Sequence, residues 1–223
     1  MKLNKISQAL VIAACFAAAS ASASTVTMPF ATNTISLQDT NWNDFLNFQK
    51  FDTSLGNLTS VQVDLYSNVV GHVDLNNFND GAVDVPVTLN VAVSVARPDT
   101  SNLVLINAPL FNQAQSVDGG GGYASLDNAY LAHGSSTFGA GPDLNMFQGP
   151  GTLSLQISAT ANNSADGDNI FSNFSTQADG YGTVTYTYTA APVPEPETYG
   201  MLLVGLGLMG VVAKRKQVRG EQA

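Results

Sequence analysis

The feature that most constrains the fold is a strict alternation of residue types from Val83 to Val95. Every odd-numbered residue in this stretch is valine or leucine, and the even-numbered residues are polar or small. A period of two residues places the apolar side chains on one face of a β-strand. Pro86 lies within the alternation, and because proline cannot donate a hydrogen bond to a sheet, we expect it at an edge or a bulge.

The same reasoning predicts several more strands. They cover residues 61–65, the 69–75 region, 103–106, 153–157 and 183–189. Clusters of asparagine, aspartate and glycine separate them, at residues 76–81, 118–122 and 166–169, and such clusters form turns. No sustained helical periodicity is present, although residues 42–48 are expected to form a short turn. Short strands joined by such turns are typical of an antiparallel β-sandwich, so the sequence predicts an all-β body.

The N-terminal segment has the three parts of a secretory signal peptide. Lys2 and Lys5 precede an apolar run at residues 9–19, and Ala21 and Ala23 supply the small-residue cleavage pattern. The apolar run is shorter than the ~20 residues that a membrane span needs. We therefore interpret residues 1–23 as a removable signal that uses the Sec translocon, and an uncleaved N-terminal anchor is the alternative.

The C-terminal segment also has three parts. The residues Val193, Pro194, Glu195 and Pro196 lie in a linker at residues 191–197, and residues 198–223 hold an apolar stretch and a basic tail. Lys214, Arg215 and Lys216 would remain on the cytoplasmic side of a membrane. Met201 to Ala213 would form a helix about 20 Å long, shorter than a hydrocarbon core of ~30 Å. This favours a temporary span over the alternative, an ordinary tail anchor.

These three C-terminal parts resemble the PEP-CTERM sorting signal of Gram-negative bacteria. The resemblance implies that an exosortase-type membrane protease cuts near Pro194, Glu195 and Pro196. It also implies transfer of the mature protein to the cell surface or the exopolysaccharide matrix. Similar tails occur on ice-binding proteins, so the resemblance indicates a destination and does not identify an activity of the body.

The body, residues 24–190, is strongly acidic and contains no cysteine. Its only basic residues are Lys50 and Arg97, against 14 aspartates and no glutamate, which gives a net charge of about −12. Nucleic acid is therefore an unsuitable partner, because its binding requires clustered lysine or arginine. Cys15 is the only cysteine and lies in the signal segment, so the mature chain lacks disulfides and thiol chemistry.

Few residues of the body carry recognisable chemistry. His72 and His133 are its only histidines, and a triad with Ser135 or Ser136 is possible only if the fold supplies the geometry. Asp166, Asp168 and Asn169 are weak calcium candidates, because hard oxygen ligands lie close together there. The segment does not follow the EF-hand spacing, so plain turn formation is the simpler interpretation. We expect no catalytic residue and no obligatory cofactor.

The body resembles the choice-of-anchor E domain at residues 51–58, Phe-Asp-Thr-Ser-Leu-Gly-Asn-Leu. That resemblance implies a secreted, surface-attached domain without a catalytic role. We therefore expect a non-enzymatic surface or matrix protein. The alternatives are a carbohydrate-, calcium- or ice-binding sandwich and, less favoured, a secreted hydrolase. An ice-binding face would need a flat threonine ladder, and Thr183, Thr185, Thr187 and Thr189 provide one strand of it.

Overall fold

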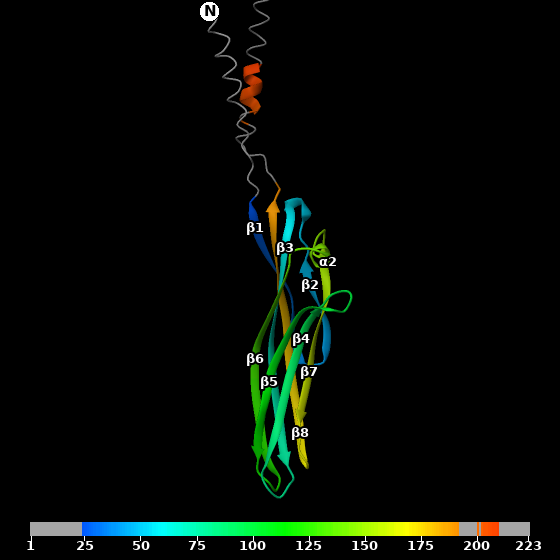
Figure 1. The fold of residues 1–223 in the computed structure, drawn as a ribbon, viewed down its shortest axis with the longest axis vertical. Coiled ribbons are helices and arrows are strands. Elements are labelled where there is room, and N and C mark those ends of the chain that lie inside the picture. The colour runs from blue at the N-terminus through cyan, green and yellow to red at the C-terminus, as the bar shows by residue number, and fades with distance from the viewer. Residues whose placement is uncertain (1–23, 192–199, 201, 210–223) are drawn as a thin grey trace, which may run out of the picture. The chain divides into compact units, whose positions relative to one another are not determined.

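The computed structural model describes residues 24–191, residue 200 and residues 202–209 (Figure 1). Residues Thr25–Thr189 form one compact unit. The described residues 202–209 are helical, and their apolar side chains are exposed to solvent. In the part of the chain that the structure describes, no helix is long and apolar enough to cross a membrane.

Two four-stranded antiparallel sheets make up the compact unit, which confirms the predicted all-β sandwich (Figure 1). Sheet A has the order β1-β8-β3-β6, and sheet B has the order β2-β7-β4-β5. The strands are β1 (Thr25–Asp39), β2 (Trp42–Gln49), β3 (Gly56–Asn77), β4 (Val83–Ala96), β5 (Asn102–Val117), β6 (Gly122–Phe138), β7 (Thr152–Ala165) and β8 (Ile170–Ala190). Two short helical elements complete the fold, η2 (Thr53–Leu55) and α2 (Pro142–Met146).

Strand β4 confirms the alternation that the sequence predicts. Its odd-numbered residues from Val85 to Val95 are fully buried, and they face the space between the sheets. Pro86 pairs with Ala114 of β5, but the pairing of β4 with β7 begins only at Val87. The carbonyl of Pro86 accepts a bond from Asp166 N on the β7 side. Pro86 therefore lies just outside the β4–β7 pairing, where its lack of an N–H removes no hydrogen bond of that ladder.

Residues 61–75 form part of one continuous strand, although the sequence predicts two separate strands there. The inward row of β3 continues through Ser67 and Gly71, where a polar residue and a residue without a side chain interrupt the apolar pattern. Ser67 is buried and satisfies its hydroxyl by donating to Asp179 O at 2.7 Å. A Cβ at Gly71 would lie 2.6 Å from a Leu89 side-chain carbon, so glycine lets the sheets approach each other there.

The short turn expected at residues 42–48 is wrong, because this segment forms β2. Leu46 and Phe48 are fully buried, and the strand pairs with β7 from Trp42 to Gln49. The segment has apolar residues at both even and odd positions, since Phe45 is exposed on the outer face. That mixture hides the period of two residues, and only pairing with β7 decides which side chains are buried.

One end of the core is aromatic. The rings of Phe51 and Phe147 lie 5.6 Å and 6.4 Å from the ring of Tyr186, and Phe48 packs edge-on against Phe147. All four side chains are essentially inaccessible to solvent. The Tyr186 hydroxyl donates to Gln49 O, so this buried polar group is satisfied. Burial raises the pKa of Tyr186 well above its usual range.

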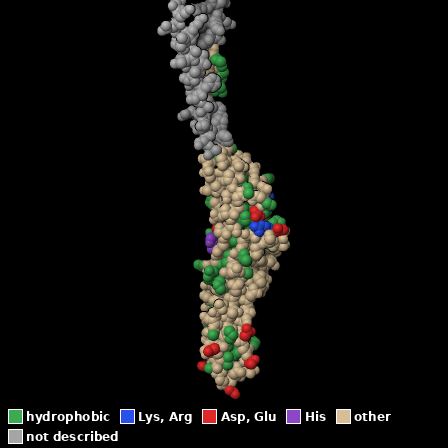
Figure 2. Space-filling model, viewed as in Figure 1, with side chains coloured by type: hydrophobic (Ala, Val, Ile, Leu, Met, Phe, Trp, Pro, Cys, Tyr) green, Lys and Arg blue, Asp and Glu red, His purple; other side chains and the backbone are tan. Residues whose placement is uncertain are grey.

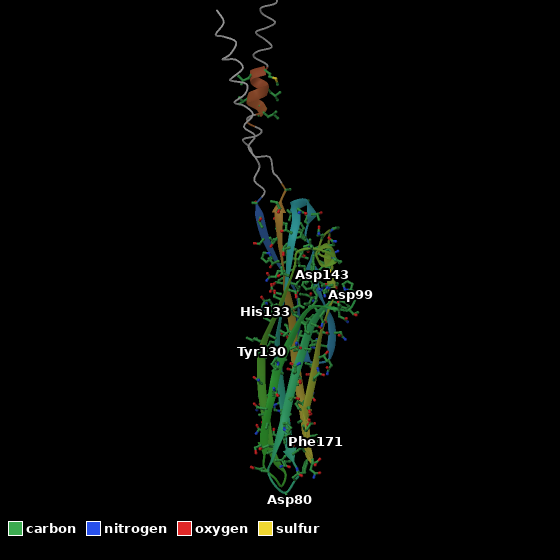
Figure 3. The ribbon with its side chains drawn as sticks, in the orientation of Figure 1. Asp80, Asp99, Tyr130, His133, Asp143 and Phe171 are labelled. Atoms are coloured by element: carbon green, nitrogen blue, oxygen red, sulfur yellow. The ribbon has the colours of Figure 1, made fainter. Side chains whose placement is uncertain are left out.

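A salt bridge fixes α2 to the turn between β4 and β5. Arg97 donates from Nε to Asp143 Oδ1 at 2.7 Å and from Nη2 to Asp143 Oδ2 at 3.0 Å. Arg97 also donates to Asn102 O and lies over the Phe138 ring. The guanidinium therefore joins three parts of the chain, and Figure 3 shows Asp143 close to the loop that carries Asp99.

Candidate functional site

The residues predicted to act in sorting lie outside the described residues. They are Ala21, Ala23, Val193, Pro194, Glu195, Pro196, Lys214, Arg215 and Lys216. The predicted sites within the body are described, and they lie in four places. One is the end of the sandwich that carries the acidic turns, and three are on the outer face of sheet A.

The structure brings three predicted turns together at one end of the sandwich, where Figure 2 shows acidic side chains and Figure 3 places Asp80. Phe78 N donates to Asn169 O at 3.0 Å, and Gly120 N donates to Asn79 O at 2.6 Å. Residues from three distant parts of the sequence therefore share one hydrogen-bond network. Gly120 has a φ of +68°, a conformation that glycine adopts without strain.

Asn77 lies at the centre of this network and has no solvent exposure. Its Nδ2 donates to Gly81 O at 2.9 Å and to Val117 O at 3.0 Å. Its Oδ1 accepts from Asn79 N at 2.9 Å and from Asn79 Nδ2 at 2.8 Å. All four bonding positions of the Asn77 amide are therefore used, and one neutral side chain joins the turns before and after it.

The calcium candidates lie at the same end of the sandwich, and they bond to other protein groups there. Asp166 Oδ2 accepts from Ser164 Oγ at 2.7 Å, and Asp168 O accepts from Asn79 Nδ2 at 2.7 Å. Asn169 donates its Nδ2 to Asn79 Oδ1 at 3.2 Å. Among the described residues, no three acidic, histidine or cysteine side chains converge as metal ligands would. A calcium ion at this end therefore stays a prediction.

His72 is held between two carboxylates on the outer face of sheet A. Its Nδ1 lies 2.7 Å from Asp127 Oδ1, and its Nε2 lies 3.0 Å from Asp74 Oδ1. The bonds to Asp127 and then to Asp74 raise the pKa of His72. The Tyr123 hydroxyl also donates to Asp74, and this bond is the main cause of the lowered pKa of Asp74. Both nitrogens of the imidazole are engaged, so the ring is oriented as a structural cross-link.

His133 forms a second histidine–aspartate pair on the same face. Its Nε2 lies 3.2 Å from Asp64 Oδ1, and its ring stacks on Tyr66 at 4.6 Å. Tyr66 stacks in turn on Tyr181 at 5.1 Å. These separations match the ~4.8 Å spacing of neighbouring strands, so the three rings form a row across β6, β3 and β8.

The arrangement around Asp64 does not have the order of a catalytic triad. Burial raises the pKa of Asp64, but hydrogen bonds from Ser135, Gln62 and His133 together lower it below its usual value. Ser135 and His133 therefore both bond to the carboxylate, whereas a triad requires the histidine between the serine and the acid. Ser136 stands opposite Val63 and belongs to the other face of β6.

The threonine row of β8 has a partial partner row on β1. Thr189 pairs with Thr25 and Thr187 pairs with Thr27, so four threonines form two adjacent pairs. Farther along, Thr185 faces Pro29 and Thr183 faces Ala31, and the second row ends. The structure thus adds Thr25 and Thr27 to the face that the sequence identifies, and the two-strand array remains short.

Two hollows that no local motif indicates lie toward the acidic end of the sandwich. The first, which we call the edge hollow, has a volume of about 300 Å³ and lies where the corner between β1 and β2 meets β7 and β8. The second, the face hollow, has a volume of about 390 Å³ and lies over β7, β4 and β5. Asn163 lines both of them. Their lining residues come from distant segments, so only the asparagine-rich composition of residues 161–175 hints at them.

The chain has only a very low similarity to solved structures of a virus. The chain is similar to the "Structure of infectious bursal disease virus Gx strain" with 7% identity and a TM-score of 0.20, over 82% of this chain and 48% of that one. A Gt strain structure of the same virus gives 11% identity and a TM-score of 0.20, over 76% and 38%. The chain thus spans less than half the length of these chains. No curated protein matches the chain.

A family model does match the C-terminal segment. The match covers residues 192–216 and has the description "PEP-CTERM protein-sorting motif". It confirms the resemblance stated for the three-part tail, whereas the resemblance of the body to the choice-of-anchor E domain stays a prediction. A motif of this kind marks a protein for export, a C-terminal membrane anchor and processing by an exosortase. The chain therefore carries a PEP-CTERM protein-sorting motif on the C-terminal side of a β-sandwich body.

Proposed function

We propose that the protein is a non-enzymatic component of the cell surface or the extracellular matrix. In this proposal an exosortase cuts the tail and the sandwich is released outside the inner membrane. The single observation that carries the proposal is the sorting motif at residues 192–216. Export by the Sec translocon and retention by exopolysaccharide are further parts of the same proposal.

Features of the body support a non-enzymatic role. Both histidines are oriented by aspartates on the outer face of sheet A, and neither lies between a serine and an acid in the order that a nucleophile requires. The sandwich has an apolar core through its centre, and the described residues use their buried polar groups mainly to join strands and turns. Such a body suits a stable module that is displayed or retained outside the cell.

The proposal is tested by replacing Pro194, Glu195 and Pro196 together with alanine. The variant should accumulate uncut in the inner membrane, while the unchanged protein should leave it. A matched control replaces Pro192, Glu197 and Thr198 with alanine, which changes the same linker and leaves the central three residues intact. Normal cutting and release of the first variant would overturn the proposed sorting step.

A further inference from the structure

The edge hollow exists because the outer strands of both sheets end part-way along the sandwich. Strand β1 pairs with β8 only as far as Gln177, and β2 pairs with β7 only as far as Ala159. Among the described residues, no strand therefore pairs with the outer side of residues 160–165 of β7 or residues 170–176 of β8. Their outward-facing backbone N–H and C=O groups are available to a ligand, apart from the few that the β1–β2 corner uses.

The β1–β2 corner closes one side of this hollow. Thr40 N donates to Thr176 O at 2.9 Å, Asn41 N donates to Ala159 O at 2.9 Å, and Asn41 Oδ1 accepts from Ala161 N at 3.2 Å. Asn41 has a φ of +68°, a conformation that asparagine adopts more readily than most residues. The corner is thus bonded to both sheets and forms a fixed wall.

The lining of the edge hollow is polar and almost uncharged. Its chemistry-bearing residues are Asp39, Asn41, Asn163, Asn173, Phe174 and Thr176. Amide and hydroxyl groups both donate and accept hydrogen bonds, as the hydroxyl groups of a sugar do. Phe174 adds an apolar surface suited to the C–H face of a sugar ring. A volume of about 300 Å³ is far larger than a single metal ion needs.

The face hollow continues the same chemistry across sheet B. Asn90, Asn112 and Asn162 supply amides and Pro109 supplies exposed apolar surface, while Phe111 is buried. The register places Asn90 opposite Asn162 on one side and Pro109 on the other, so these residues form one row across three strands. From β5 to β7 that row extends about 10 Å, two strand spacings. A β5 bulge beside this row, between Phe111 and Pro109, interrupts the regular pairing.

We propose that the two hollows form one binding track for a neutral polysaccharide, which passes over β7 at Asn162 and Asn163. This inference rests on the proposed function as a matrix protein and names the ligand class and its site. No lysine or arginine of the part of the chain that the structure describes lines either hollow, and the net charge of the body repels polyanions. A peptide strand is a poorer occupant, because the open edges are short and offer no alternating apolar sockets.

The test is native affinity electrophoresis of the protein as its own host produces it. Gels contain hydroxyethyl cellulose, dextran, the neutral polysaccharide fraction of the host matrix, or the polyanion alginate. The unchanged protein should be retarded by at least one neutral polymer and not by alginate. Asn163→Ala with Asn173→Ala should weaken that retardation about tenfold, since each loses hydrogen bonds to the ligand. Asn43→Ala, an exposed amide on β2, is the matched control and should leave it unchanged.

A second variant, Asn112→Ala, changes the far end of the track on β5. It keeps the test valid if the double variant does not fold. The proposal would be overturned if neutral polysaccharide retarded Asn112→Ala and the folded double variant as strongly as it retards the unchanged protein. Retardation by alginate alone would also overturn it, as would binding of a peptide with the sequence of residues 170–176 in place of any polysaccharide. A protein found outside the inner membrane that no neutral polymer retards would overturn the track and leave the proposed function standing.

Discussion

Replacing Asn77 with alanine should destabilise the sandwich strongly, because this one amide joins the turns at its acidic end. The substitution removes the donors of Gly81 O and Val117 O and the acceptor of Asn79 N. Asn79 can turn its own side chain to water, and Gly81 is exposed, but the bond to Val117 O is buried. One buried and two part-buried groups would be left without partners, and at about 1 kcal/mol each the loss is about 3 kcal/mol.

For a domain of this size, that loss corresponds to a fall in Tm of about 6 to 12 °C. Thermal unfolding followed by circular dichroism, together with urea denaturation, measures both quantities. Asn76→Ala is the matched control, because it removes the same amide from the outward-facing position next along β3, and it should cost less than about 0.5 kcal/mol. A loss below about 1 kcal/mol for Asn77→Ala would refute the reasoning.

The same experiment separates the amide network from a calcium ion. If Asn77 holds the turns, EDTA should leave the unfolding midpoint of the unchanged protein where it was. If an ion at Asp166, Asp168 and Asn169 holds them, EDTA should lower that midpoint by as much as the substitution does. The second result would show that a bound ion, and not the Asn77 amide, carries the stability of this end.

Three further predictions concern stability. Because the pKa of His72 is raised in the fold, protonated His72 stabilises the fold fully below the ordinary histidine pKa near 6.5, and this stabilisation is lost as pH rises through the folded pKa. His72→Gln should therefore lower the free energy of unfolding, measured by urea titration, more near pH 6 than near pH 8. An equal loss at both pH values would contradict the ion pairs. Arg97→Lys should lower the free energy of unfolding by about 1 kcal/mol, since lysine cannot bond Asp143 with two parallel N–H groups. Lys50→Arg is the control, and no loss for Arg97→Lys would show that water solvates the Arg97–Asp143 pair. Tyr186→Phe should lower the free energy of unfolding by about 1 to 2 kcal/mol in urea denaturation, because it leaves Gln49 O unpaired. An unchanged free energy of unfolding would mean that water replaces the hydroxyl.

The parts of the fold that the sequence predicts well are those where apolar residues alternate without interruption. Val83 to Val95 is such a segment, and the structure places it in the interior of sheet B with its odd-numbered side chains buried from Val85 onward. The predictions fail where an inward position carries a polar residue. Ser67 lies in the gap between the two predicted strands, 61–65 and 69–75, because its fitness for an inward position depends on Asp179, which is distant in sequence.

The candidate sites divide in the same way. The tail motif is local, so residues 192–216 can be identified from sequence alone. The three acidic turns are also visible in the sequence, but nothing in their composition tells that Asn77 and Asn79 join them. The two hollows escape prediction altogether, because their shape follows from where β1 and β2 stop pairing.

The measurement that tests the central claim most directly is the intact mass and the location of the mature protein from its own host. We expect a chain that runs from about Ser24 to the region of Pro194 and is found outside the inner membrane. A chain in the inner membrane that still ends at Ala223 would contradict it, and would make this protein an ordinary tail-anchored sandwich.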